Sequence, residues 1–390
     1  MIYVGIDVAK DKHDCLITDS HGEVLLDSFT FQNTRTGFDS FVARLAGCSE
    51  DMSDIKVGLE ATGHYSDNLL EFLLDKGYHT FVINPLHSNL YRKGLSLRKT
   101  KTDALDALSI VTMLRTENLQ SYTPQSYHTR ELKSLTRYRF SLVQTCAKLK
   151  SSYTRLVTIL FPELLHLVST LHQKSMHTML LELPGATPIA LCHLTRLTHL
   201  LQEASKGHYG KAKAAEIREA ARTSIGSHNA AKALELQQTI RMIRLMTEQI
   251  TQVEDMIKPI IDSLHCPIMT IPGISYSLAA MIYAEIGDFK AFGSAEKILA
   301  FAGMEPSVYQ SGQLNSTHAK MVKRGSKYLR YALFQAAKYA CNWDSTFAAY
   351  LQKKRSEGKA YNVAVSHAAK KLVRVMYHLV KRNQPFRRAV

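Results

Sequence analysis

The apolar positions of the first 125 or so residues follow two different periodicities. Strand-like runs cover residues 2–9, 13–31, 55–61 and 79–85, and a Ser-His-Gly turn divides the second run into two strands. Helix-like periodicity covers residues 36–47, 66–77 and 101–115. This order predicts three antiparallel strands followed by alternating helices and strands, which makes a mixed α/β domain.

The middle of the chain has a different pattern, typical of long helices. From residue 128 to 161 apolar residues recur at alternating steps of three and four, and only Arg139 interrupts the series. The seam consists of Leu132, Leu135, Leu142, Cys146, Leu149, Tyr153, Leu156 and Leu160. A second long helix is predicted over residues 230–261. The two helices favour a coiled coil or long hairpin, formed within one chain or across a dimer. No role is evident for residues 165–230.

A Pro-Gly turn precedes an apolar helix within residues 269–282, and residues 181–194 carry a fainter copy of it. The second copy, with Gly273 at its turn, resembles a helix-hairpin-helix, in which backbone N–H groups hold a phosphate. A simple packing corner explains this turn equally well, and it is the better interpretation of the first copy. We expect three domains, with boundaries at residues 1–125, 126–265 and 266–390, the last one mainly α-helical.

The charge of the chain indicates a polyanionic partner. Lys and Arg number 49 against 34 Asp and Glu, which gives a net charge of +15, and hydrophobic residues make up 45% of the chain. These values are typical of a globular protein with a polyanionic partner, and nucleic acid is the first candidate. The C-terminal 70 or so residues interleave Lys and Arg with Tyr, as phosphate contact and base stacking require.

The remaining composition excludes several classes of protein. The six cysteines are far apart, so neither a zinc site nor a redox pair is expected. Neither a membrane-spanning run nor a signal peptide is evident, so we expect no membrane partner and a cytoplasmic protein.

Four acidic residues form the strongest candidate for a catalytic site. Asp7 ends the first predicted strand and Glu60 ends a later one, while Asp103 and Asp106 share one face of a helix. Clustered carboxylates attract a hard cation such as Mg²⁺, and two such ions can clamp a phosphodiester. A basic run stands directly before that helix and suits a passing phosphate backbone; it contains Arg92, Lys93, Arg98, Lys99 and Lys101.

A second candidate lies in a loop-like segment near residue 311. It holds Ser307, Ser311, Ser316 and Thr317, and basic residues follow at Lys320, Lys323, Arg324, Lys327 and Arg330. A serine in a basic loop that binds phosphate can attack the phosphorus of DNA, because the nearby cations lower the free-energy cost of forming the serine alkoxide. From the chemistry alone, ordinary turn hydroxyls remain the commoner explanation.

In combination these motifs resemble a known family. GIDVAK, LEATGHY and KTDALDA match the DEDD motifs of the RuvC-like, RNase H-like domain in insertion-sequence transposases of the IS110 family. Residues 271–312 and the following KRGSKYLRYAL resemble the C-terminal domain of that family. The similarity covers nearly the whole chain in the right order.

The resemblance implies a bacterial or archaeal recombinase, associated with the nucleoid, that moves a mobile element between donor and target DNA. It implies that the four acids bind Mg²⁺ and that Ser311, in a Ser-Gly motif, forms a covalent bond with DNA. It also implies a structured noncoding guide RNA, and a dimer or tetramer in which acids and serine come from different subunits. The run QLNSTHAKMV after the motif lacks the family's glycines, so Ser307 and Ser316 remain alternatives.

Three other functions can be weighed against this one. Actin-like sugar kinases and ATPases share the first strand, but they need Gly and Thr or Ser after its acid, whereas Val8, Ala9 and Lys10 stand here. A RuvC-like structure-specific DNA endonuclease would use the same acids without a covalent intermediate, and it is the main alternative. A DNA-binding protein with a degenerate core is disfavoured, because all four acids are present.

Overall fold

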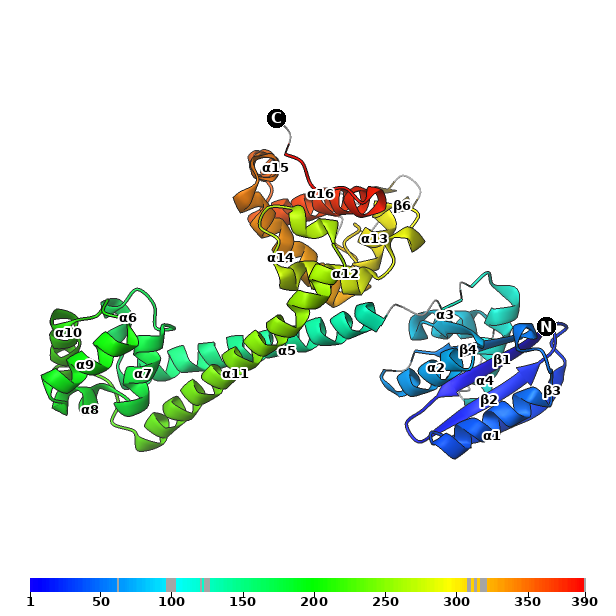
Figure 1. Cartoon of the computed structure of the whole chain (residues 1–390), viewed down its shortest axis with the longest axis horizontal. Coiled ribbons are helices and arrows are strands. Elements are labelled where there is room, and N and C mark those ends of the chain that lie inside the picture. Colours follow the sequence, from blue (N-terminus) through cyan, green and yellow to red (C-terminus); the bar gives the residue numbers. More distant parts are fainter. Residues whose placement is uncertain are drawn as a thin grey trace. The chain divides into compact units, whose positions relative to one another are not determined.

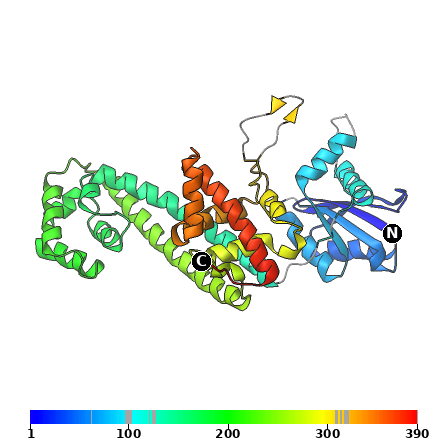
Figure 2. The ribbon, with the colours of Figure 1, turned by 90° about the horizontal axis from the view of Figure 1, so that it is seen from above.

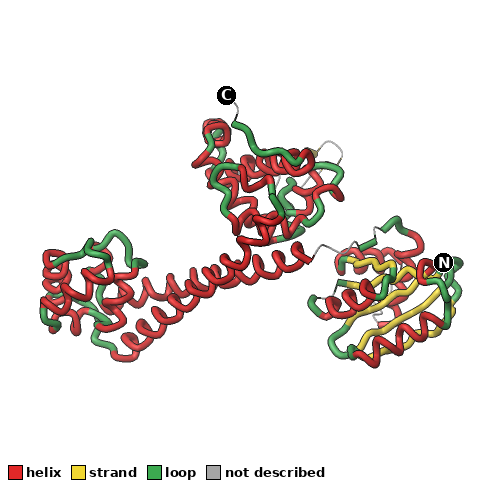
Figure 3. The backbone as a smooth tube through the Cα atoms, viewed as in Figure 1, coloured by secondary structure: helices red, strands yellow, loops and turns green. Residues whose placement is uncertain are grey.

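The computed structural model describes residues 1–61, 63–95, 103–119, 121–122, 127–306, 310–311, 314–315 and 321–388. The chain divides into two compact units, Met1–Pro124 and Gln125–Val390 (Figure 1). The first unit is an α/β domain, and the second is almost entirely helical (Figure 3).

A five-stranded mixed sheet forms the centre of the first unit, with the strand order β3-β2-β1-β4-β5. β2 pairs with both β1 and β3, and both of these pairs are antiparallel. β4 pairs with both β1 and β5, and both of these pairs are parallel. The strands are β1 (Ile2–Val8), β2 (Lys12–Thr18), β3 (Val24–Gln32), β4 (Ile55–Glu60) and β5 (His79–Ile83). The predicted meander and α/β alternation are therefore confirmed, and this topology is RNase H-like.

The sheet is covered by helices on both faces. Even-numbered β1 residues such as Val4 and Ile6 pack against α1 (Arg35–Ala46) and α2 (Tyr65–Asp75). The odd-numbered face instead packs against α4 (Asp103–Thr116). A further helix, α3 (Pro85–Leu95), follows β5 and contacts α4. It was not predicted, because its segment has no regular apolar spacing.

Two long helices form the axis of the second unit. α5 (Tyr127–Leu160) and α11 (Ala230–Ser263) each have 34 residues and run side by side, as Figures 1 and 2 both show. Their bounds confirm the two predicted helices to within a few residues. The connecting segment forms five shorter helices with their own apolar core: α6 (Leu164–Leu167), α7 (Lys174–Glu182), α8 (Ala186–Leu191), α9 (Leu194–Ala204) and α10 (Lys211–Arg222).

The C-terminal part of the second unit packs against the other ends of α5 and α11, with which it shares one apolar core. It contains α12 (Tyr276–Ile286), α13 (Ala295–Phe301), a short hairpin of β6 (Gln310–Ser311) and β7 (Leu314–Asn315), α14 (Lys327–Trp343), α15 (Ser345–Ser356) and α16 (Tyr361–Arg382). Short 3₁₀ turns lie at Met52–Asp54, Pro267–Thr270 and Phe289–Ala291. Within the described ranges, none of the helices combines the length and apolarity that a membrane span requires.

Candidate functional site

Two of the predicted acids leave the sheet side by side. β1 and β4 are parallel neighbours and Ile6 pairs with Leu59, so the next residues, Asp7 and Glu60, lie together at the carboxyl ends of the two strands. Both side chains are partly buried. They belong to the face of the sheet that packs against α4, because side chains alternate along a strand.

Two glycines bring α4 close to these acids. Gly5 and Gly58 each stand two residues before an acid and therefore face α4. A Cβ atom on Gly5 would lie 2.4 Å from the carbonyl oxygen of Ala107, and one on Gly58 would lie 2.7 Å from Cδ1 of Leu114. The absence of side chains at these positions lets the backbone of α4 approach the sheet, which places the N-terminal half of that helix over the strand ends.

Asp106 completes the described part of the acidic site. Its side chain is 11% exposed, and one carboxylate oxygen accepts a hydrogen bond of 2.5 Å from Nη1 of Arg92 on α3. Nη2 of the same guanidinium donates to the Asn89 side chain at 3.2 Å. α3 thus supplies a cation to the acids, at a position where the sequence suggested a phosphate contact.

A polar cleft of about 320 Å³ joins these groups. It is lined by Asp7, Val8, Glu60, Pro85, Ser88, Asn89, Arg92, Asp106 and Ser109. The Ser88 hydroxyl donates to Glu60 at 2.7 Å, which fixes that carboxylate at the cleft wall. The structure therefore brings Asp7, Glu60 and Asp106 to one cleft, as the sequence predicted.

The other predicted residues of this unit can be placed only in part. Asp103 is the first residue of α4, but its side chain lies outside the described part of the structure. Arg98, Lys99 and Lys101 are also outside the described residues, while Lys93 is exposed on α3. Among the side chains that the structure does describe, no three His, Cys, Asp or Glu are gathered tightly enough to hold a metal ion. Carboxylate oxygens are nevertheless the donors that Mg²⁺ prefers, so the chemistry of the cleft fits such an ion.

Sequence reasoning missed one acid near this cleft. Asp14 on β2 pairs directly with Asp7 across the antiparallel ladder, so both side chains project from the same face. Its carboxylate accepts a hydrogen bond of 2.7 Å from Thr30 and lies 3.7 Å from the Lys12 ammonium. The strand register was the only signal that could have identified it.

The second candidate site begins at a hairpin in the C-terminal part. Ser311 on β6 pairs with Leu314 on β7, and Pro306 forms a bridge with Met321 at the base. The side chain of Ser311 lies outside the described part of the structure, as do Ser307, Ser316, Thr317 and Lys320.

The basic turn that follows the hairpin is held in a defined shape. Lys323 has a positive φ of 56°, which is uncommon for a residue with a side chain, and its N–H donates to the Gly303 carbonyl. Nη1 of Arg330 donates to the carbonyls of Ala302 and Lys323, so this predicted phosphate ligand braces the turn. Lys323, Arg324 and Lys327 are exposed.

An ion pair with a buried carboxylate anchors the helix after this turn. Glu285 on α12 is 1% exposed and accepts two hydrogen bonds from Arg137 of α5, at 2.6 and 3.1 Å. It also accepts one of 2.7 Å from the Ser326 hydroxyl, which caps α14. The Arg137 guanidinium lies over the Tyr328 ring, with 4.7 Å between its carbon and the ring centroid. This network, which the sequence analysis did not find, ties α5, α12 and α14 together beside the basic turn.

Gly273, the remaining predicted contact, lies at a close crossing of two segments. Its φ is +85°, and a Cβ atom there would lie 2.8 Å from the Tyr339 carbonyl oxygen on α14. The Pro-Gly turn thus serves as a packing corner, and the helix that follows it is capped by Ser275.

Two family models match the chain. A model described as "Transposase", of the IS110 DEDD type, matches residues 4–162. One described as "Transposase IS116/IS110/IS902 family" matches residues 266–352. The first range includes all four candidate acids, and the second includes the hairpin with Ser311.

Known proteins resemble the chain along most of its length. The pilin gene-inverting protein of Moraxella lacunata is 23% identical over 392 residues, covering 98% of this chain and 97% of the relative. The transposase for insertion sequence element IS1328 of Yersinia enterocolitica is 22% identical over 347 residues, covering 86% and 82%. Among solved structures, Thermus thermophilus RuvC in complex with a Holliday junction substrate aligns at 11% identity and a TM-score of 0.23, over 31% of this chain and 99% of RuvC. Because the two family models and the relatives agree, the chain belongs to the IS110 family of transposases and is a DNA transposase.

Proposed function

We propose that the protein cuts and rejoins the DNA of a mobile element, with a Mg²⁺ site formed by Asp7, Glu60, Asp103 and Asp106. The observation that carries this proposal is the shared cleft: three of the four acids line one polar cavity at the strand ends. The fourth, Asp103, lies one helical turn before Asp106 on α4. A bound divalent ion would stabilise the charge that develops on the phosphodiester oxygens.

Within this site the residues of the chain have separate tasks. Glu60 is positioned by its hydrogen bond from Ser88, and α4 is positioned by its contact with Gly5. Arg92, which pairs with Asp106, can turn to a phosphate once a divalent ion takes over that carboxylate. Lys93, Arg98, Lys99 and Lys101 would then follow the DNA backbone.

Ser311 is the proposed nucleophile. Its Oγ attacks phosphorus, a Ser–O–P bond forms, and the bond from phosphorus to one DNA oxygen breaks, leaving that oxygen to take up a proton. The exposed cations of the adjacent turn, Lys323, Arg324 and Lys327, support this role because they can hold the phosphate. Gly273, Lys320 and Arg330 belong to the same proposed nucleic-acid surface.

The partners proposed for this reaction are donor DNA, target DNA and a structured noncoding guide RNA. Residues 266–390 carry 19 Lys and Arg against six Asp and Glu, so this third of the chain holds +13 of the net +15. Such a concentration of positive charge supports binding to more than one nucleic acid strand. The family resemblance is what suggests a guide RNA.

We also propose that the chain has three domains with different roles: residues 1–125 hold the metal, 126–265 form a coiled-coil arm, and 266–390 carry the serine. The acids and Ser311 would come from different subunits of a dimer or tetramer. A mixture of Asp106→Ala and Ser311→Ala chains tests this arrangement, since it should regain part of the activity that each lacks alone.

The decisive experiment traps the reaction on DNA. The full-length protein, with any RNA that copurifies, is incubated with Mg²⁺ and DNA that contains the element's ends, then denatured and digested. Mass spectrometry should find a phosphodiester-linked peptide at Ser311, which Ser311→Ala should abolish. Attachment at Ser307 or Ser316 would show that this serine, and not Ser311, is the nucleophile. DNA cleavage without any adduct would overturn the serine mechanism in favour of the endonuclease alternative.

A further inference from the structure

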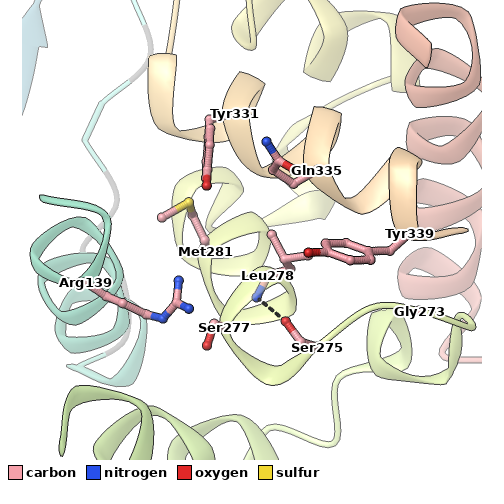
Figure 4. A pocket seen from close by; sticks show the side chains of 9 residues that line it. All are labelled: Arg139, Gly273, Ser275, Ser277, Leu278, Met281, Tyr331, Gln335 and Tyr339. Atoms are coloured by element: carbon pink, nitrogen blue, oxygen red, sulfur yellow. Dashed lines mark hydrogen bonds between the residues drawn. The ribbon is translucent and has the colours of Figure 1, made fainter. Parts of the chain in front are cut away.

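A cleft of about 220 Å³ lies where α12 meets α14 in the second unit, and its described lining includes neither the candidate acids nor the residues of the serine hairpin. It is lined by Arg139, Gly273, Ser275, Ser277, Leu278, Met281, Tyr331, Gln335 and Tyr339, which Figure 4 shows. Cavities for drug-sized ligands measure about 300–1,000 Å³. This cleft is smaller and suits a single flat group.

One face of α14 forms the wall of this cleft. Tyr331, Gln335 and Tyr339 follow one another at four-residue spacing, so they project from the same side of the helix toward Leu278 and Met281 (Figure 4). Trp343, the only tryptophan of the chain, continues the series. Tyr339 is 47% exposed and Trp343 is 67% exposed. Large aromatic side chains in a row at a cleft mouth form a stacking platform.

Two close contacts hold the helix that carries this platform. The Phe140 ring packs edge-on against Tyr331, with 4.8 Å between the ring centroids. On the other side, Gly273 lies so close to α14 that an added Cβ would be 2.9 Å from Cδ1 of Trp343. The cleft is thus formed without a ligand, and a ligand would bind without a large cost of ordering it.

Hydrogen-bonding groups remain available on the same wall. Within the described part of the chain, the Gln335 amide and the Tyr331 and Tyr339 hydroxyls have no hydrogen-bond partner. An amide offers a donor and an acceptor side by side, which matches the edge of a nucleobase.

The charge distribution around the cleft favours a neutral base inside it and the attached phosphates outside it. Arg139 points in from α5, but its guanidinium pairs with Glu254 at 2.5 Å, and the Ser277 hydroxyl donates to the same carboxylate. The interior is therefore close to neutral, whereas the surrounding C-terminal third is strongly basic. A neutral aromatic group belongs inside and its phosphates belong outside.

We propose that this cleft binds an unpaired nucleobase, which stacks on Tyr339 and Trp343 and is read at its edge by Gln335. The ligand is a single-stranded segment of RNA or DNA, because a paired base shows neither a free face nor a free Watson–Crick edge. The inference rests on nucleic acid being the partner of this protein, but not on the acids or on Ser311.

Trp343 provides a direct readout, because tryptophan emission from this chain comes from one position. Full-length protein is titrated with single strands of about ten nucleotides, within the site sizes of about 4–16 that such surfaces cover. We expect saturable quenching by single strands, and little by a duplex or by an abasic strand of equal length and charge. Matched RNA and DNA strands show which of the two binds more tightly.

Variants locate the binding site. Tyr339→Ala and Gln335→Ala should each weaken single-strand binding by about 5- to 150-fold, the usual loss for one stacked or recognised base. Gln335→Glu keeps the shape and should weaken binding through its charge, so a folding defect in the truncations leaves the test intact. Tyr361→Ala is the control, since Tyr361 on α16 is also 47% exposed but lies outside the cleft.

Three results would overturn the inference: equal quenching by the abasic strand, equal losses for Tyr339→Ala and Tyr361→Ala, or concentration-dependent emission without nucleic acid. The last result would assign the platform to contact between copies of the chain. None of these readouts uses DNA cleavage or the serine adduct, so failure here and failure of the proposed function can be told apart.

Discussion

Gly5→Ala should separate α4 from the sheet. The new Cβ would lie 2.4 Å from the carbonyl oxygen of Ala107, whereas ordinary contacts begin at 3.4 Å. Because a backbone atom cannot rotate away, α4 or β1 must shift by about 1 Å, and overpacking of this kind costs about 1–3 kcal/mol. The same shift displaces Asp106 relative to Asp7. A misplacement of about 1 Å can lower a reaction rate about 100-fold, so we expect a loss of that size in DNA cleavage.

Two other glycines give graded comparisons. Gly58→Ala meets side-chain atoms of Leu114 and Ile110 and no backbone atom, and side chains can shift more easily than backbone, so its effect should be smaller than that of Gly5→Ala. Gly94→Ala lies on α3 with no described atom within 4 Å of the added carbon, and it should stabilise the helix by up to about 1 kcal/mol.

Hydrogen exchange measured by mass spectrometry is the suitable assay, because a chain of two units does not unfold in one transition. Peptides from β1 and α4 should exchange about 5- to 150-fold faster in Gly5→Ala, while peptides from α11 remain unchanged. Unchanged protection of α4, or a larger effect of Gly58→Ala, would show that the glycines do not control this packing.

Three further outcomes are expected. Arg92→Gln should tighten Mg²⁺ binding about tenfold, as measured by calorimetry, because a competing cation leaves Asp106, whereas exposed Lys93→Gln should have little effect. Glu285→Gln should destabilise the C-terminal core by about 1.5–3 kcal/mol, as measured by exchange in α12, because the buried carboxylate loses its charge-assisted hydrogen bonds from the 42% exposed Arg137 side chain and from Ser326. Glu235→Gln, which removes one partner of an exposed ion pair, should have little effect. Burial lowers the pKa of His177 to about 4, so between pH 6.5 and 4 the unfolded chain takes up this proton more readily than the folded chain. The stability of the α7 region should therefore fall as the pH falls through this range, and His177→Phe should reduce that dependence, leaving the part that comes from His172, whose pKa burial also lowers.

Several elements that the sequence predicted correctly carry a continuous set of buried apolar residues. The strands β1 and β4 and the helices α1, α5 and α11 each bury such a set, so their secondary structure could be predicted from the apolar pattern. α3 lacks such a set: it contains Gly94 and contacts α4 through few apolar side chains, Tyr91 among them. Its existence follows from the tertiary contact, which no local pattern records.

The acids were predictable and their neighbours were not, for a geometric reason. Asp7 and Glu60 end recognisable strands, so their common edge follows from strand order. The side of the sheet on which Asp14 lies depends on the register with β1, and a slip of one residue would have put His13 there instead. The pairing of Arg137 with Glu285 depends in the same way on the register between α5 and α12. Register is a property of the assembled core, and side-chain partners 148 positions apart cannot be inferred before it exists.

The one polar residue in the apolar seam of α5 has a structural role that the seam alone does not predict. Arg139 is the residue that breaks the apolar seam of α5, and it stands where α5 faces both α11 and the cleft at α12. A charged residue at such a position costs stability unless it is paired, and Glu254 supplies that pairing. An apolar residue at 139 would have completed the seam but left Glu254 without its cation beside the cleft. Arg139 and Glu254 together therefore give the cleft a polar lining without net charge, next to the aromatic face of α14.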